Sequence, residues 1–283
     1  MAHDSERPLI IFTNDDGIGS PGLWAVVAAF AGMGDLLVAA PRDQQSGMAR
    51  SMPAGSSGSI SEYEPPIAIE NCQAYAIDGS PAQTVQHGVL ELADRKPSLA
   101  ISGINYGDNT GNGVTISGTV GAALEAASLD IRAIAVSLQT PFDLHLTHSS
   151  DVDFSVAAHF THMIGRWLIR HQALPDDVDL LKLDIPWEAT TETDWRLTRI
   201  SRRRVYWPTR PERKTLAGRG RMGYHYNTDP SKAEPDSDVY ALMHDQVVSI
   251  TPMSLNMSSR TDLFRLRQII EGEREYGTAS GAD

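Results

Sequence analysis

The sequence has a single cysteine, no long hydrophobic run and less basic than acidic charge. With Cys72 alone, an intrachain disulfide framework is impossible and a cysteine-based metal site is not expected. No stretch approaches the roughly 20 apolar residues that a transmembrane helix needs. The first residues, MAHDSERPLI, also lack the apolar region of a secretory signal peptide. These absences predict a soluble, cytoplasmic protein without a membrane partner.

The charge of the chain is unevenly distributed. The chain has 24 Lys and Arg against 36 Asp and Glu, a net charge of −12. The stretch Arg199–Arg221 holds nine Lys and Arg and one acidic residue, so it carries +8 and the remainder carries −20. Because nucleic-acid binding depends on clustered basic contacts with phosphates, the acidic remainder argues against nucleic acid as a general partner.

The first two thirds of the chain alternate short apolar runs with helical patterns, which is typical of an α/β protein with a parallel sheet. We assign residues 1–187 to this core. The predicted strands are Leu9–Phe12, Leu36–Ala40, Ser98–Ser102, Arg132–Leu138 and Val178–Ile185.

Serine–proline pairs predict two helix starts, since Ser caps free N–H groups and Pro at the first helical position loses no hydrogen bond. These pairs are Ser20-Pro21 and Ser80-Pro81. Further helices are expected at Gly118–Ser128, around Asp153–His171 and at Thr261–Glu275.

The character of the sequence changes after Pro186, where tryptophans, the basic stretch and clustered turn residues follow. Val247–Thr251 has the composition of a strand. We expect residues 188–260 to form an irregular β extension that returns to the core, and residues 261–283 to form a C-terminal helix and a frayed tail.

Two adjacent carboxylates follow the first predicted strand, in Asn14-Asp15-Asp16-Gly17. Ligands of open parallel sheets bind at the carboxyl ends of strands. A carboxylate pair there is costly unless a cation neutralises it, and oxygen ligands suit Mg²⁺, Mn²⁺ or Ca²⁺. Asn, Asp and Gly equally favour turns, so a simple turn or helix cap is the alternative interpretation.

Two more polar loops follow predicted strands. Arg42–Gly47 offers Ser46 as a ligand or phosphate contact, although its composition is that of an ordinary turn. Ser102–Gly113 is rich in Gly and places the neutral oxygen of Asn105 at a strand end. It leads to Ser117-Gly118-Thr119, where the N–H groups and dipole of a helix start favour a phosphate.

These loops converge at one edge of the sheet, and together they indicate metal-assisted phosphoryl hydrolysis. A cation there would polarise the phosphate and lower the pKa of its bound water. Asp15 or Asp16 could orient or deprotonate that water. No pair of the Ser-His type occurs at these loops, which makes a covalent seryl route less attractive.

Five motifs of the chain, in this order and spacing, resemble the SurE family. They are TNDDGIGSPGL (13–23), VAAPRDQQSG (38–47), DGSPAQTV (78–85), SGINYGDNTGNGVTISGTVGAALEA (102–126) and VVSITPM (247–253). The family pattern runs over most of residues 8–255, and its NDDG, SGIN and SGTVGAA elements are highly specific.

The resemblance implies a divalent-metal-dependent 5′/3′-nucleotidase that releases phosphate from nucleoside monophosphates. It implies a Rossmann-like, mostly parallel sheet sandwiched by helices, with a C-terminal β-hairpin or arm used to form a homodimer or homotetramer. One divalent cation per subunit (Mg²⁺, Mn²⁺ or Ca²⁺) would be held by Asp15, Asp16, Ser46 and Asn105. Phosphate contacts would fall on Gly47, Ser117, Gly118 and Thr119, with Asn14 close to the catalytic Asp15 and Asp16.

The chain departs from the family pattern at several positions outside the implied ligands. The family usually has Thr-Pro-Ala-Asp-Cys at Ser80–Thr84, Tyr at Ile116, Asn at Asp184 and Asp at Asn256. These departures leave base preference and oligomer contacts open. A broad phosphomonoesterase or short-chain polyphosphatase, and a non-catalytic nucleotide-binding protein, are the alternative functions.

The basic stretch has three interpretations. It could bind RNA through stacking on Tyr206 and Trp207, steer anionic nucleotides, or pair with the acidic surface of a neighbouring subunit. Arg and aromatic residues are enriched at interfaces, so we favour an oligomerisation arm. The spaced pairs His159/His162 and His145/His148 lack an obvious third ligand, and we interpret them as surface or interface histidines.

Overall fold

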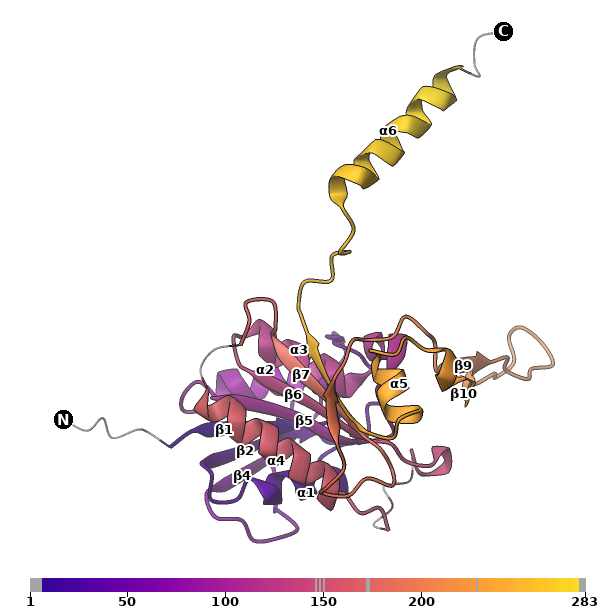
Figure 1. Cartoon of the computed structure of the whole chain (residues 1–283). Coiled ribbons are helices and arrows are strands. Elements are labelled where there is room, and N and C mark those ends of the chain that lie inside the picture. The colour runs from indigo at the N-terminus through magenta and orange to yellow at the C-terminus, as the bar shows by residue number, and fades with distance from the viewer. Residues whose placement is uncertain are drawn as a thin grey trace.

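The fold is a nine-stranded sheet with helices on both faces and a small hairpin beside it (Figure 1). The computed structural model describes residues 7–279 apart from 146, 148, 150, 172, 173 and 228, so the end of the predicted tail, 280–283, lies outside the described part. None of the described helices is long and apolar enough to cross a membrane.

Six parallel strands form the centre of the sheet, which confirms the predicted fold class. They are β1 (Leu9–Thr13), β2 (Asp35–Pro41), β4 (Cys72–Ile77), β5 (Leu99–Tyr106), β6 (Ala133–Leu138) and β7 (Leu180–Ile185). Their spatial order, β4-β2-β1-β5-β6-β7, is that of a Rossmann fold. Since the order reverses between β1 and β5, a ligand crevice is expected at the carboxyl ends of these two strands.

The edges of the sheet carry three further strands. β3 (Ile60–Glu62) pairs antiparallel with β4, and β11 (Val248–Met253) pairs antiparallel with β7. β8 (Trp195–Leu197) lies outermost, parallel to β11. β11 was predicted from the sequence and β8 lies within the predicted β extension, whereas β3 and β4 were not predicted.

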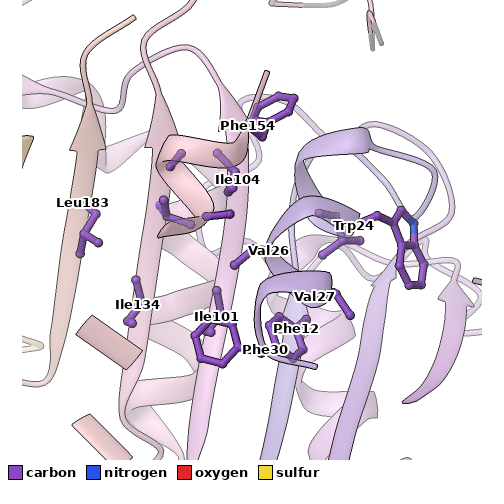
Figure 2. Close-up of a cluster of buried hydrophobic side chains, with 14 of the residues drawn as sticks. Phe12, Trp24, Val26, Val27, Phe30, Ile101, Ile104, Ile134, Phe154 and Leu183 are labelled. Atoms are coloured by element: carbon purple, nitrogen blue, oxygen red, sulfur yellow. The ribbon is translucent and has the colours of Figure 1, made fainter. Parts of the chain in front are cut away.

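Alternating side chains of each central strand build two apolar layers. Ile10 and Phe12 face α1 (Pro21–Ala29) and α4 (Ser155–Arg170), whereas Leu9 and Ile11 face the layer beneath α2 (Pro81–His87) and α3 (Gly118–Ser128). In the first layer the rings of Phe12 and Phe30 meet edge to face at 5.7 Å (Figure 2). Strands buried on both faces explain the continuous apolar runs of the sequence.

The two predicted serine caps have different outcomes. Ser80 forms a reciprocal capping box with Gln83, as its helix-start pattern allows. Ser20 occupies the cap position of α1, but its side chain makes no capping bond, so that part of the prediction is wrong. Its backbone N–H instead donates to the Gly17 carbonyl at 3.0 Å, and Pro21 supplies the helix start.

The C-terminal third contributes to the core and also extends away from it. Besides β8 and β11 it contains the antiparallel hairpin β9 (Tyr206–Thr209) and β10 (Gly223–Tyr226), α5 (Asp238–Met243), and α6 (Leu263–Ala279), which stands away from the body in Figure 1. Short 3₁₀ helices lie at Gly111–Thr115, Phe142–Leu144 and Pro230–Lys232, and a π-helical turn at Gly88–Leu92 continues α2.

Candidate functional site

A cavity of about 340 Å³ opens at the carboxyl ends of β1 and β5, where the strand order reverses. This volume lies within the roughly 300–1,000 Å³ of small-molecule sites. One group of its lining residues, here called the acidic wall, is Asp15, Asp16, Ser46, Gly47, Asn105 and Ser117. A second group, here called the aromatic wall, is His145, Arg204, Tyr206, Pro208 and Tyr224.

The adjacent carboxylates of the acidic wall are almost fully buried, with Asp15 5% and Asp16 2% exposed. Burial raises the pKa of Asp15. Burial and, after it, the neighbouring charge of Asp15 raise the pKa of Asp16 well above its usual value. Hydrogen bonds from Gln44 Nε2 at 3.1 Å and from the Tyr106 N–H at 3.3 Å oppose that rise in Asp16.

The N-terminus of α3 holds Asp15 in place. The Thr119 hydroxyl donates to Asp15 Oδ1 at 2.5 Å, and the backbone N–H groups of Gly118 and Thr119 also favour the ionised carboxylate. A Cβ at Gly118 would lie 2.8 Å from Asp15 Oδ2, which explains why glycine occupies this position. The Thr119 hydroxyl, expected at a phosphate, is therefore committed to the carboxylate that it positions.

The other predicted residues lie around this pair. Ser46 and Gly47 line the cavity, with Gly47 in the left-handed region at φ 77°. Ser117 also lines it while its Oγ caps α3 by accepting the Val120 N–H at 3.1 Å. The Asn105 amide nitrogen donates to the Tyr106 and Gly107 carbonyls, which leaves the amide oxygen as the ligand atom it can offer.

Asn14 shapes the loop that carries the carboxylates. Its Nδ2 donates to the Gly17 carbonyl at 2.9 Å, and its Oδ1 accepts the Gly17 N–H at 3.1 Å. Gly17 has φ 95°, a conformation that favours glycine. Asn14 is fully buried, and these two bonds fix the turn that follows β1.

The donor set of the acidic wall fits a hard divalent cation. Two buried carboxylates whose pKa values are raised form a site of excess negative charge that a cation would relieve. No cluster of three His, Cys, Asp or Glu capable of holding a metal occurs in the described part of the chain. Asp15, Asp16, Ser46 and Asn105 all line one cavity, so their hard oxygen atoms are of the kind that such a cation prefers.

The aromatic wall was largely missed by the sequence analysis. His145, interpreted there as a surface or interface residue, lines the cavity, and burial lowers its pKa. Tyr206 donates its hydroxyl to Asp108 Oδ1 at 2.8 Å, and burial together with the Asp108 charge raises the Tyr206 pKa. Tyr224 comes from the second hairpin strand, a position that no local signal connected with the site. His159 is exposed, and His148 lies outside the described residues.

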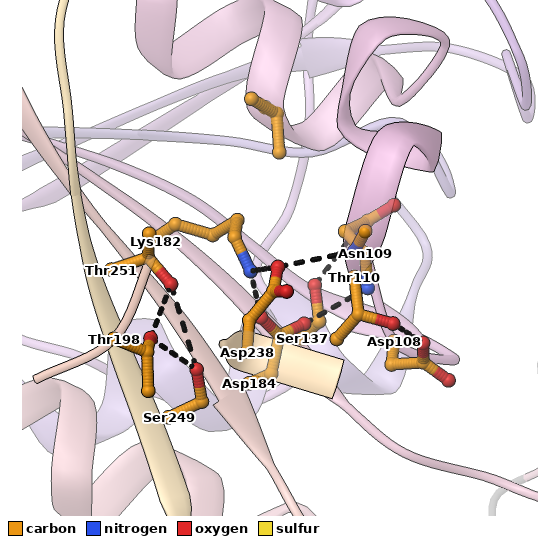
Figure 3. A network of polar contacts seen from close by, with 12 residues as sticks. Asp108, Asn109, Thr110, Ser137, Lys182, Asp184, Thr198, Asp238, Ser249 and Thr251 are labelled. Carbon is orange, nitrogen blue, oxygen red and sulfur yellow. Dashed lines mark hydrogen bonds and ion pairs between the residues drawn. The ribbon is translucent and has the colours of Figure 1, made fainter. Parts of the chain in front are cut away.

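A buried ion network contacts the loop that contains Asp108, Asn109 and Thr110, three residues that line the cavity (Figure 3). Lys182 is fully buried and pairs with Asp184 and, at 3.2 Å, with Asp238. Burial lowers the Lys182 pKa, but the two carboxylates outweigh it, so the pKa lies above its usual value. Asp184 accepts the Asn109 N–H at 2.9 Å and Asp238 the Gly111 N–H at 3.1 Å. The network thereby fixes the backbone of the cavity loop.

Comparison with known proteins identifies the family. The family model described as "Survival protein SurE" matches residues 10–206. The chain belongs to the SurE family. The matched SurE region includes the whole acidic wall and reaches Tyr206 at the start of the hairpin.

Curated SurE relatives span nearly all of the chain. A protein named 5′-nucleotidase SurE from Thermococcus kodakarensis is 36% identical over 92% of this chain and 98% of its own length. A protein of the same name from Thermococcus gammatolerans is 37% identical over 93% of this chain and 96% of its own length. Another, from Methanocella arvoryzae, is 37% identical over 92% of this chain and 97% of its own length. The crystal structure of the SurE protein from Aquifex aeolicus matches with a TM-score of 0.72 and 26% identity, covering 94% of this chain and all of that one.

Proposed function

We propose that this chain is a divalent-cation-dependent phosphatase that hydrolyses nucleoside 5′- and 3′-monophosphates to nucleoside and phosphate. The observation that carries the proposal is the buried Asp15–Asp16 pair, whose pKa values are raised, against the N-terminus of α3 in one cavity. The relatives named 5′-nucleotidase SurE support the nucleotide as the substrate.

The cation would be held by Asp15, Asp16, Ser46 and Asn105. When bound, such an ion supplies Lewis-acid polarisation of the phosphate and lowers the pKa of water. Whether Mg²⁺, Mn²⁺ or Ca²⁺ serves is left to experiment, since all three accept oxygen ligands.

The residues of the chain have separate roles in orienting water, accepting its proton and binding the phosphate. Asp15, fixed by Thr119 and the start of α3, orients the attacking water, and Asp16 can accept its proton at a carboxylate oxygen. Gly47 and Ser117 border the phosphate position at the N-terminus of α3, while the backbone N–H groups of Gly118 and Thr119 stabilise the Asp15 carboxylate. Asn14 maintains the turn and does not need to touch the substrate.

Phosphate release from a panel of 5′- and 3′-nucleoside monophosphates, measured with Mg²⁺, Mn²⁺ or EDTA, tests the proposal. We expect release that EDTA abolishes and that falls by at least about a thousandfold in Asp16→Asn, because the variant removes a charged ligand and the proton acceptor. Circular dichroism and the melting temperature show whether the variant is folded.

Other outcomes identify the alternatives. Equal turnover of nucleotides and p-nitrophenyl phosphate would indicate a broad phosphomonoesterase, and cation binding without turnover a non-catalytic nucleotide-binding protein. Full activity of folded Asp16→Asn would overturn the mechanism. A homodimer or homotetramer formed through the C-terminal arm, and a cytoplasmic location, stay predictions of the sequence.

A further inference from the structure

Five aromatic rings from two separate elements form one cluster, and three of them, His145, Tyr206 and Tyr224, line the cavity. The hairpin β9–β10 contributes Tyr206, Tyr224 and Tyr226, and the segment at the 3₁₀ helix Phe142–Leu144 contributes Phe142 and His145. Neighbouring ring centroids lie 5.1 to 6.2 Å apart, mostly edge to face. The rings therefore form one continuous apolar surface.

Strand alternation places the hairpin rings on one face. Tyr206 pairs with Tyr226 and Pro208 with Tyr224, while Trp207 pairs with His225 between them. Successive side chains of a strand point to opposite faces, so Tyr206, Pro208, Tyr224 and Tyr226 share one face of the hairpin, and this face borders the cavity. Tyr206, Pro208 and Tyr224 do line it.

The Tyr224 ring remains accessible although it contacts its neighbours. Tyr224 is 41% exposed and lies 5.1 Å from the Phe142 ring, which is 50% exposed. The inner ring, Tyr206, is instead fixed by its hydrogen bond to Asp108. Tyr224 therefore offers an accessible ring in the same cavity that Asp15 and Asp16 line.

We propose that this aromatic wall is the nucleobase subsite, with Tyr224 as the ring on which the base stacks. The inference rests on the proposed nucleotidase function, because it needs a phosphate held at the acidic wall. Every base has a π-face, so stacking accepts all nucleobases. Since a larger ring system buries more apolar surface, the wall favours purines over pyrimidines.

The test compares AMP with ribose 5-phosphate, which keeps the sugar and phosphate and lacks the base. In Tyr224→Ala, we expect the ratio of kcat/KM for AMP to kcat/KM for ribose 5-phosphate to fall about tenfold, chiefly through KM for AMP. Tyr224→Phe keeps the ring and should keep the ratio. Adenosine, added as an inhibitor of ribose 5-phosphate hydrolysis, should bind correspondingly more weakly to Tyr224→Ala.

His225→Ala is the matched control, because it removes a ring from the same strand on the opposite face. It should leave the ratio at its wild-type value. An unchanged ratio in Tyr224→Ala, including one in which both substrates lose activity equally, would overturn the subsite and assign the rings to anchoring the hairpin. If the wild-type protein releases no phosphate from AMP with any cation, it is the nucleotidase function itself that fails.

Discussion

The two walls of the cavity are built in different ways. On the acidic wall, Asp15 and Asp16 are buried, and donors from α3, from the Gln44 side chain and from the end of β5 fix their carboxylates. On the aromatic wall, Tyr224 is about half exposed, like the neighbouring Phe142, and both lie on short elements. Phosphoryl transfer requires fixed charges, whereas stacking requires a flat accessible ring. The difference separates the side suited to the reaction from the side suited to substrate selection.

The Asn109–Gly111 loop of the cavity depends on the ion network of Lys182, and the largest effect is expected there. Lys182→Met would leave Asp184 and Asp238 buried without their cation, so we expect the free energy of unfolding to fall by about 3–5 kcal/mol. Urea unfolding with a fixed m-value measures this loss.

A double-mutant cycle with Asp184→Asn shows whether the loss comes from uncompensated charge. The double variant removes one of the two stranded carboxylates, so it should be less destabilised than the sum of the single variants. Strict additivity would contradict the coupling of Lys182 with Asp184. Activity measured below the unfolding transition shows in addition whether the Asn109–Gly111 loop is displaced.

The acidic wall could be predicted from the sequence because its signals are local. An apolar run followed by Asn-Asp-Asp-Gly marks a strand and its polar end, and parallel strands bring such ends together whatever their register. Ser46 has no such signal, and only the family resemblance selected it. The Thr119 contact with Asp15 joins residues 104 positions apart and became visible only in the structure.

The aromatic wall could not be predicted because tertiary packing assembles it. His145 lies in an irregular loop and meets Tyr206 across 61 positions of sequence, with ring centroids 6.2 Å apart. The missed strand β4, CQAYAI, has small and half-buried side chains and lacks the apolar run of its neighbours. Lys182 and Asp184 did leave a usable signal, since charges two residues apart in a buried strand share one face and require partners.

Two glycines near the cavity allow the importance of the Asp15 position to be tested by the same substitution. Gly118→Ala would place a Cβ 2.7 Å from Asp15 Cβ, so Asp15 must move, and we expect kcat to fall about a hundredfold. Gly113→Ala meets no atom within 4 Å and should keep kcat within about twofold. Steady-state kinetics on AMP with both folded variants decide this, and equal rates would show that the Asp15 position is not critical.

The smallest expected effect is a pH-dependent stabilisation by a cation, which should be specific to the acidic wall. Since the folded-state pKa values of Asp15 and Asp16 lie above the usual 3.8, their contribution to stability is lost as pH rises above that value in cation-free protein. A cation favours the ionised pair, so Mn²⁺ should raise the melting temperature more at about pH 8 than at about pH 5. At a hundredfold excess of Mn²⁺ over its Kd, binding adds up to about 2.7 kcal/mol to the free energy of unfolding. The variant Asp15→Asn/Asp16→Asn lacks the buried charge and should show neither the pH dependence nor the shift with Mn²⁺. Tyr224→Ala, which alters the opposite wall, should retain both, and an equal loss in that variant would show that the two walls are not independent.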